Sequence, residues 1–439
     1  MIRRALRMLI AAAIAATPLA ALAAGDAATP TTVNAGGATV VRQADDTASL
    51  VGIEFVVRAG LDRQTMRQNG LSALVAESIL RTPAGTPPMP LEQAVAANGG
   101  AVRFTVDPDD VRFYVESLAV DAPAVLALVR SALSAPDFSP ATVRDARAAL
   151  VRQITEQQDG ALQVGMDMLN AASAPQANTG LPSLGTPASL AQLVPADAAA
   201  FYRTYYRRGG SYVSAVGRLS AIDDATLQSF ADALPEGNTS VVQAHVAPLK
   251  GSSREIIAHR DIASPWLIAQ YPAPSVNSKD FGPMLVLAAF VKRTLADIAQ
   301  VPGVVTTTFT SRAVGTVYNY DRQPPRLVLY VNGGIGNPSR AFATALSIVN
   351  VLAATKLEGS IDDFKAVAAG DFATGATTLE SRAWLAAVFA QTGNSPDFLN
   401  RTLQEIAATT PDDVQRVARL YLGNPTIALV LPRDATPRN

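Results

Sequence analysis

One stretch of this chain places three residues at the spacing with which a helix can hold a metal ion. Within residues 69–80, Ala73, Ala76 and Glu77 stand at i, i+3 and i+4, which share one helix face. A hydrolytic zinc needs about three nitrogen or oxygen ligands and one open position. Alanine has no lone pair to donate, and Glu77 alone cannot hold zinc. Zinc hydrolysis requires a bound zinc ion that lowers the pKa of a water molecule, so this helix cannot support that mechanism.

The other reactive side chains offer no alternative catalytic centre. The chain has two histidines, His245 and His259, which share no helical face with each other or with residues 69–80. We expect both to be surface or edge-strand residues. There is no cysteine and no Gly-x-Ser-x-Gly motif, so neither a thiol nor a serine elbow supplies a nucleophile. Residues 333–336 are glycine-rich, but they lack the lysine of a phosphate loop, which favours a turn.

The elements around residues 69–80 predict how this stretch is positioned. Its apolar residues recur at steps that stack them on one face of an amphipathic helix: Leu71, Leu74, Val75 and Ile79. Upstream, residues 37–41 and 51–60 are typical of two strands joined by a polar turn. The sequence Gly70-Leu71-Ser72 then opens the helix.

Together these residues resemble the start of the pitrilysin/insulinase family, which includes the mitochondrial processing peptidases. Its members begin with a strand pair, an Arg-Ala-Gly turn (residues 58–60 here) and a Gly-Leu-Ala-His-Leu-x-Glu-His helix. In that family two histidines one turn apart hold zinc, and the glutamate beside the second activates a water. Here the three positions hold Ala73, Ala76 and Glu77, so the resemblance implies a scaffold with a degenerate motif.

The resemblance also implies positions for two further parts of the family's site. The third zinc ligand of the family is a glutamate in a later helix, and the best register places Gln153 there, with Glu156 one turn away. In the second half, residues 310–320 resemble a segment whose arginine and tyrosine hold the substrate backbone in the partner's chamber. Arg312 and Tyr318 are the matching residues. A guanidinium can clamp a peptide carbonyl, and a phenol can donate to an oxyanion.

Composition limits the cellular setting and the classes of partner. The 439 residues include 36 basic and 37 acidic side chains, so no charge excess points to nucleic acid or an anionic membrane. Residues 1–23 have a basic start, a short apolar core and an Ala-x-Ala end, which predicts a cleaved signal peptide. With no cysteine for lipid attachment and no later span, we expect a periplasmic or secreted protein without a membrane anchor.

Sequence landmarks recur at a constant offset of 216 residues, which indicates an internal repeat. Phe55 matches Tyr271, residues 111–115 match 327–331, and residues 195–205 match 411–421. We therefore predict an α/β (α+β) fold of two homologous domains, each a mixed, mainly antiparallel sheet with helices packed on one face. The predicted order is a signal peptide (1–23), flexible lead-in (24–36), N-terminal domain (37–233), linker (234–254) and C-terminal domain (255–434).

The sequence predicts a non-catalytic, substrate-binding subunit of a zinc metallopeptidase complex. A zinc-bearing sister chain would be the partner and peptides the substrate, with zinc expected in the partner and no cofactor in this chain. Independent peptidase activity is not expected, because the zinc motif is lost. The alternative is a stand-alone peptide-binding or chaperone-like protein that does not cut its ligands.

Overall fold

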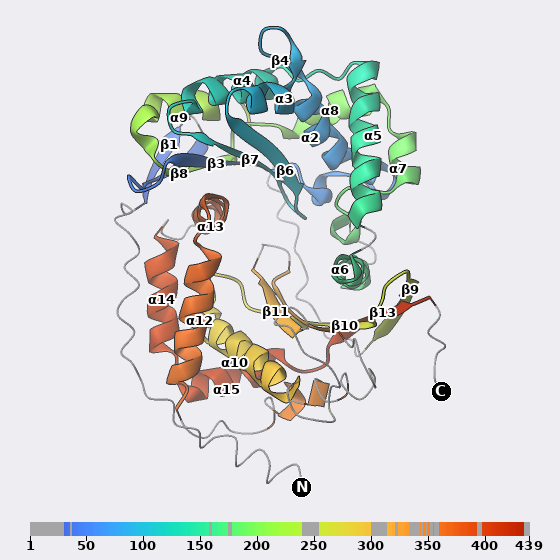
Figure 1. Cartoon of the computed structure of the whole chain (residues 1–439), viewed down its shortest axis with the longest axis vertical. Helices are drawn as coiled ribbons and strands as arrows, with labels where there is room; N and C mark the ends of the chain where they lie inside the picture. Colours follow the sequence, from blue (N-terminus) through green and yellow to red (C-terminus); the bar gives the residue numbers. More distant parts are fainter. Residues whose placement is uncertain are drawn as a thin grey trace.

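Two β-sheets, one in each half of the chain, set the architecture of the protein, which we describe from a computed structural model (Figure 1). The structure describes residues 30–35, 37–157, 160–173, 178–238, 254–299, 314–320, 324–332, 360–392 and 397–433, with several positions between 343 and 354. The predicted signal peptide and Arg312 lie outside these residues.

The sheet of the N-terminal half has six strands in the order β1-β2-β8-β3-β7-β6. Their bounds are β1 (Thr31–Ala35), β2 (Ala38–Ala44), β3 (Leu50–Val57), β6 (Gly100–Val106), β7 (Val111–Leu118) and β8 (Tyr212–Gly217). Only β2 and β8 run parallel. The central β3 is almost wholly apolar and is buried on both faces, as expected for a strand covered from two sides.

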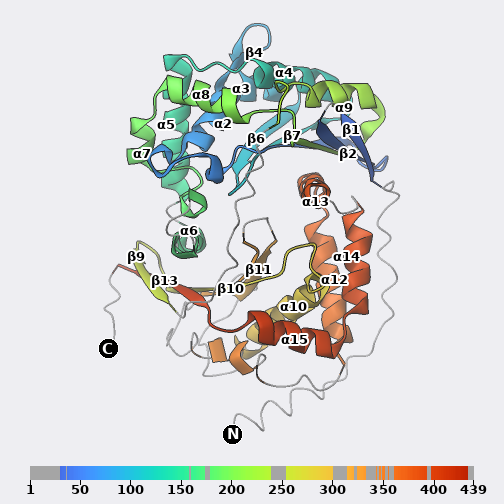
Figure 2. The ribbon, with the colours of Figure 1, turned by 180° about the vertical axis from the view of Figure 1, so that it is seen from behind.

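Helices cover one face of this sheet (Figures 1 and 2). The helices of this half are α2 (Leu71–Arg81), α3 (Leu91–Ala97), α4 (Ala122–Ser134), α5 (Pro140–Gln157), α6 (Ala161–Ser173), α7 (Pro187–Gln192), α8 (Pro195–Tyr205) and α9 (Asp224–Ala231). Short elements are the strand pair β4 (Pro83–Ala84) and β5 (Met89–Pro90) and the 3-10 helices at Leu61–Arg63, Met66–Gln68, Asn178–Gly180 and Leu219–Ala221. The core between sheet and helices includes Phe55, Phe113, Tyr206 and Phe230.

The C-terminal half has a five-stranded sheet in the order β11-β12-β10-β13-β9. Its strands are β9 (Glu255–Arg260), β10 (Trp266–Pro272), β11 (Val314–Asn319), β12 (Arg326–Asn332) and β13 (Thr426–Pro432). Its helices are α10 (Phe281–Ala299), α12 (Asp362–Gly375), α13 (Leu379–Gln391), α14 (Phe398–Ala408) and α15 (Pro411–Tyr421).

The two sheets share one topology, which confirms the predicted fold of two homologous α/β domains. The order β2-β8-β3-β7-β6 corresponds to β9-β13-β10-β12-β11, and each sheet has one parallel pair at the same place. The constant offset would pair Tyr271 with Leu329, as Phe55 pairs with Phe113, but Tyr271 pairs with Leu327. A shift by two residues keeps every side chain on its original face, so the core pattern survives.

Two sequence expectations about the connecting segments differ from the structure. Residues 31–35, expected in a flexible lead-in, form β1, because the Thr-Thr-Val run can pair with the open edge of β2. At the start of the expected linker, Leu234 is buried in the N-terminal core and Gly237 accepts a hydrogen bond from Gly209. Residues 239–253 lie outside the described residues, and the domain boundaries stay predictions.

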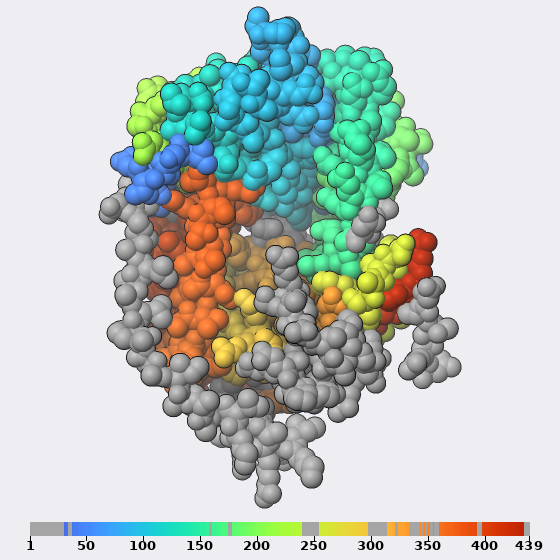
Figure 3. Space-filling model, viewed as in Figure 1, coloured from blue at the N-terminus to red at the C-terminus, as the bar shows by residue number. Residues whose placement is uncertain are grey.

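One helix of each half packs against the sheet of the other half. Helix α13 of the C-terminal half packs on β3 and β8, on the face opposite the helices of the N-terminal half. Helix α6 of the N-terminal half packs on β10 and β13. Figure 3 shows a hollow between the halves, bordered by these two helices. None of the described helices is long and apolar enough to cross a membrane.

Candidate functional site

The helix α2 begins at a glycine that the local geometry requires. Gly70 has a φ of 91°, and a Cβ there would lie 2.8 Å from Leu190 Cδ2 and 3.0 Å from the Leu184 carbonyl oxygen. The next residues tie the helix to the turn at residues 58–60. The Ser72 hydroxyl donates to the Ala59 carbonyl, and the Ser72 amide donates to Gln64 Oε1 at 3.2 Å. The turn and the helix therefore form one rigid unit.

The helix α2 has no exposed face, although its apolar residues recur at the spacing of one helix face. Every residue from Leu71 to Leu80 is buried. The sheet, α5 and α8 surround it, so the apolar face meets the core and the opposite face meets neighbouring helices. A helix of small and apolar residues is suited to this central position.

Two of the three positions that would carry zinc chemistry are part of the hydrophobic core. Ala73 and Ala76 are both 0% exposed and belong to the core of the N-terminal half. They offer no donor atom. The residues at these positions therefore do not fit a zinc ion.

The third position, Glu77, is held in a salt bridge. Its Oε1 lies 2.7 Å from Arg81 Nη2 and accepts from Arg81 Nε at 2.8 Å, while Arg81 Nη1 lies 2.6 Å from Glu92 Oε1. Burial raises the pKa of Glu77, and the hydrogen bond from Arg81 opposes that rise. The carboxylate that occupies a ligand position thus already has a cation as partner, supplied from its own helix.

The neighbouring helix α5 carries Gln153 but does not complete a metal site. Helix α5 packs along α2, and Arg152 lies near enough to lower the pKa of Glu77. Gln153 is half-buried and Glu156 is exposed. Within the described ranges, no group of three or more His, Cys, Asp or Glu side chains is arranged to hold a metal ion.

The histidines lie away from α2 or outside the described residues. His259 is an exposed residue of β9, an edge strand of the C-terminal sheet. Its Nδ1 lies 3.2 Å from the Pro432 carbonyl oxygen. His245 lies outside the described residues. The expectation of an edge-strand histidine holds for His259.

Strand β6 forms one edge of the N-terminal sheet, next to α2. Along Gly100–Thr105 its residues alternate between partly buried and exposed. An edge strand presents unpaired backbone amides and carbonyls, to which another extended chain can bond. The degenerate helix therefore stands beside a backbone surface that can hold a peptide.

Tyr318, the predicted substrate contact, has a partner inside the C-terminal half. Its hydroxyl donates to the Pro274 carbonyl, and its ring lies 5.6 Å from that of Phe281. Burial raises the pKa of Tyr318 well above its ordinary value. Its role in substrate binding stays a prediction, and that role requires the hydroxyl to leave Pro274. The role of Arg312 also stays a prediction.

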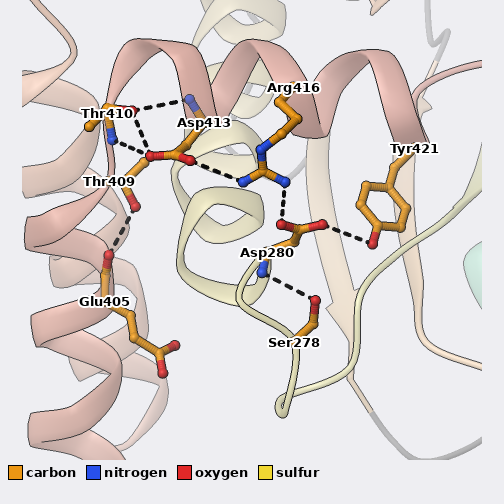
Figure 4. A network of polar contacts seen from close by, with 8 residues as sticks. All are labelled: Ser278, Asp280, Glu405, Thr409, Thr410, Asp413, Arg416 and Tyr421. Carbon is orange, nitrogen blue, oxygen red and sulfur yellow. Dashed lines mark hydrogen bonds and ion pairs between the residues drawn. The ribbon is translucent and has the colours of Figure 1, made fainter.

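A polar network joins the start of α10 to α15 (Figure 4). Asp280, which directly precedes α10, is paired with Arg416 of α15 and accepts from the Tyr421 hydroxyl at 3.3 Å. Arg416 also lies 3.0 Å from Asp413, which caps α15 together with Thr410. Asp280 and Tyr421 of this network lie near enough to Tyr318 to raise its pKa further.

Sequence reasoning missed a charged cluster on the inner face of the N-terminal sheet. Glu54 of β3 is 1% exposed and lies 3.4 Å from Arg112 of β7. Arg112 stacks on Trp384 of α13, 3.9 Å from the ring centre. The signal was a single glutamate in the otherwise apolar sequence of Leu50–Val57.

Residues 39–187, which include β2, β3, α2 and α5, match the model of the insulinase family, peptidase family M16. This part of the chain is therefore similar to the insulinase family. The resemblance drawn from the turn at 58–60 and the helix at 69–80 is therefore confirmed. The matched segment ends before the C-terminal half, which repeats the strand order of the N-terminal sheet.

Solved structures extend the likeness to nearly the whole chain. The inactive domain of an M16 peptidase from Pseudomonas fluorescens has a TM-score of 0.77 at 13% identity, covering 93% of this chain and 99% of that one. A protease from Helicobacter pylori has a TM-score of 0.76 at 13% identity, with coverages of 92% and 99%.

A third similar structure is part of a complex. A chain of complex III2 from Candida albicans has a TM-score of 0.73 at 15% identity and covers 91% of this chain and 95% of its own length. At these identities the likeness shows the insulinase-type fold of the two halves. No curated protein sequence matches the chain.

Proposed function

We propose that this chain is a non-catalytic, substrate-binding subunit of a periplasmic or secreted insulinase-type zinc peptidase. It pairs with a zinc-bearing sister chain and completes the chamber that holds the peptide. The observation that carries the proposal is the occupation of the motif: two core alanines and a glutamate neutralised by Arg81 stand where the zinc ligands and the general base would be.

The preserved surroundings support binding rather than loss of all function. The start of α2 is hydrogen-bonded to the segment that follows the turn at 58–60, and β6 lies at the edge of the sheet. An extended peptide can pair with such an edge strand. The Pseudomonas fluorescens protein of the same fold is itself described as an inactive domain. A scaffold without ligands but with an open strand edge suits a subunit that positions peptides for another chain.

Affinity purification of the tagged chain from its native host tests this proposal. We expect near-stoichiometric recovery of a second chain with an intact His-x-x-Glu-His motif. When the two chains are mixed, peptide turnover by that chain should rise. Recovery of the chain alone, together with full activity of the zinc-bearing chain without it, would contradict the subunit role.

A second candidate is a stand-alone peptide-binding protein, which the open β6 edge favours. It predicts that the purified chain binds a labelled extended peptide of alternating valine and threonine without a partner. Strand pairing uses the amides of every second residue, so N-methylation of one alternate set should abolish binding while the other set is tolerated. Equal loss with both sets would count against edge pairing.

A further inference from the structure

The contact between α13 and the N-terminal sheet is unusually rich in charge. Arg103 of β6 donates from Nε to Glu380 of α13 at 3.0 Å, and Arg382 of α13 pairs with Asp45 at 2.7 Å. Arg112 lies over Trp384 and is 2.6 Å from Asp107. The contacts of Glu380, Arg382 and Trp384 link two halves of the molecule that are far apart in sequence.

Glu54 lies in the middle of this contact with incomplete hydrogen bonding. Its cross-strand neighbours are Tyr114 of β7 and Ser214 of β8. Glu54 Oε2 and Ser214 Oγ are both buried without a hydrogen-bond partner. A buried carboxylate lacking partners is costly when charged, whereas a neutral carboxyl gains a hydroxyl that can donate.

The groups that face Glu54 include both signs of charge. They are Arg112, Tyr114 and Glu116 of β7, Arg103 of β6, Tyr212 of β8, Asp107 at the β6–β7 turn and Glu380 of α13. Of these, Arg112 favours the charged form of Glu54, and Glu380 and Asp107 disfavour it. Tyr114 is bound to Glu116 at 2.6 Å, and Arg103 is paired with Glu380. Arg112 is itself shared with Asp107, so its support for Glu54 is divided.

The reciprocal contact, between α6 and the C-terminal sheet, is mostly apolar. It forms a separate core from Val164 and Leu169 of α6 with Ile268, Val328 and Ala428 of the sheet. Its polar part is a small group in which Gln270 donates to Ser173 at 2.6 Å. The buried members of this core carry no titratable group, so protonation does not change the packing among them.

We propose that the α13 contact is a proton-sensitive latch in which Glu54 is neutral when the helix is fully docked, and that the α6 contact is the permanent hinge. When Glu54 ionises, its negative charge lies beneath α13 and is only partly balanced by Arg112. This charge favours dissociation of α13 from the sheet. The hinge keeps the two halves joined while the inner face of the N-terminal sheet becomes accessible. This inference does not depend on the proposed peptidase partner.

The direction of the pH effect follows from linkage. Burial raises the pKa of Glu54 to about 7, despite the opposing effect of Arg112. When α13 leaves, water reaches the carboxyl and its pKa returns towards the ordinary 4.5. The docked state therefore binds the proton more tightly than the open state. Docking is strongest at low pH and is weakened as pH rises through about 7.

Alkylation of single cysteines measures each contact separately, because the chain has no native cysteine. Ala383 and Ala428 are both 0% exposed. Ala383 shares the α13 face of Glu380, and Ala428 lies in the α6 contact. The alkylation rates of Ala383→Cys and Ala428→Cys report how often each contact opens. Each rate is divided by the rate of the same cysteine variant that also carries Glu54→Gln, measured at the same pH. This ratio cancels the pH dependence of thiol ionisation.

We expect this ratio to rise about tenfold for Ala383→Cys between about pH 6 and pH 8, and to stay constant for Ala428→Cys. With Arg112→Gln the rise should move to higher pH, because Glu54 loses its nearest cation. Glu236→Gln, which removes an exposed carboxylate, should change neither rate. A flat ratio for Ala383→Cys would overturn the latch, and parallel rises at both cysteines would show global unfolding instead.

Discussion

Glu77 stands at the position of a zinc-binding histidine in the family motif but takes part in a salt bridge instead. In a zinc site the helix positions bring donor atoms to a shared metal, whereas here the carboxylate stabilises its own helix through Arg81. Arg81 also reaches Glu92, so the cation joins α2 to α3. The residue types alone showed that the zinc ligands are missing. The salt bridge could not be predicted from the sequence, because the direction of these side chains depends on the packing around α2.

Removing the cation tests this structural role. We expect Arg81→Ala to lower the free energy of unfolding by about 3 kcal/mol, the lower end for a broken buried pair, since Arg81 is 20% exposed. Because the folded pKa of Glu77 is raised and rises further without Arg81, the loss should be larger at about pH 8 than at about pH 5. Urea unfolding at both pH values measures it.

The control for that experiment removes the charge on Glu77 as well. In Glu77→Gln/Arg81→Ala the difference between the two pH values should disappear, because no buried carboxylate is left without a partner. An equal loss at both pH values in Arg81→Ala alone would contradict the role of Glu77.

At the scale of elements, local sequence signals located most of the N-terminal half. Exposure alternates along β6, and a proline occupies the first turn of both α8 and α15, which are local sequence signals for a strand and for helix starts. Local sequence signals did not predict features that depend on contacts with residues far away in the sequence. The β1 strand depends on the open edge of β2, and the complete burial of α2 depends on α5 and α8.

The start of α2 is the element boundary most open to test. We expect Gly70→Ala to lower the free energy of unfolding by about 1–2 kcal/mol, because alanine disfavours the left-handed conformation and its Cβ meets Leu190. Thermal or urea unfolding measures the change. Gly370→Ala in α12 is the matched control, since open space surrounds it, and it should stabilise the chain by about 0.5–1 kcal/mol. Equal effects at both glycines would contradict this account of the boundary.

At the scale of the whole molecule, the exchange of α6 and α13 joins the two copies of the repeat. The constant offset of 216 residues indicated two similar halves, but no local pattern marked which helices would cross. Each crossing helix needs a sheet that lies far away in sequence. The charged face beneath α13 was hidden for the same reason, since Arg103 and Glu380 are 277 residues apart.

The close approach of α6 to its sheet depends on Gly165. A Cβ at this position would lie 2.4 Å from Ile268 Cδ1, so we expect Gly165→Val to loosen α6 and destabilise the chain by about 1–3 kcal/mol. Faster alkylation of Ala428→Cys should accompany the loss. Gly160→Ala, with its nearest neighbour at 3.4 Å, should change neither property. Unchanged alkylation in Gly165→Val would show that α6 does not need this contact.

The central claim is that an insulinase-type scaffold here has exchanged its zinc chemistry for packing. The most direct measurement is the zinc content of the purified chain after exposure to excess zinc and desalting, together with its cleavage of a quenched fluorescent peptide. We predict far less than one zinc per chain and no chelator-sensitive cleavage, because Ala73 and Ala76 offer no donor atom. One retained zinc per chain with cleavage that a chelator abolishes would contradict the account.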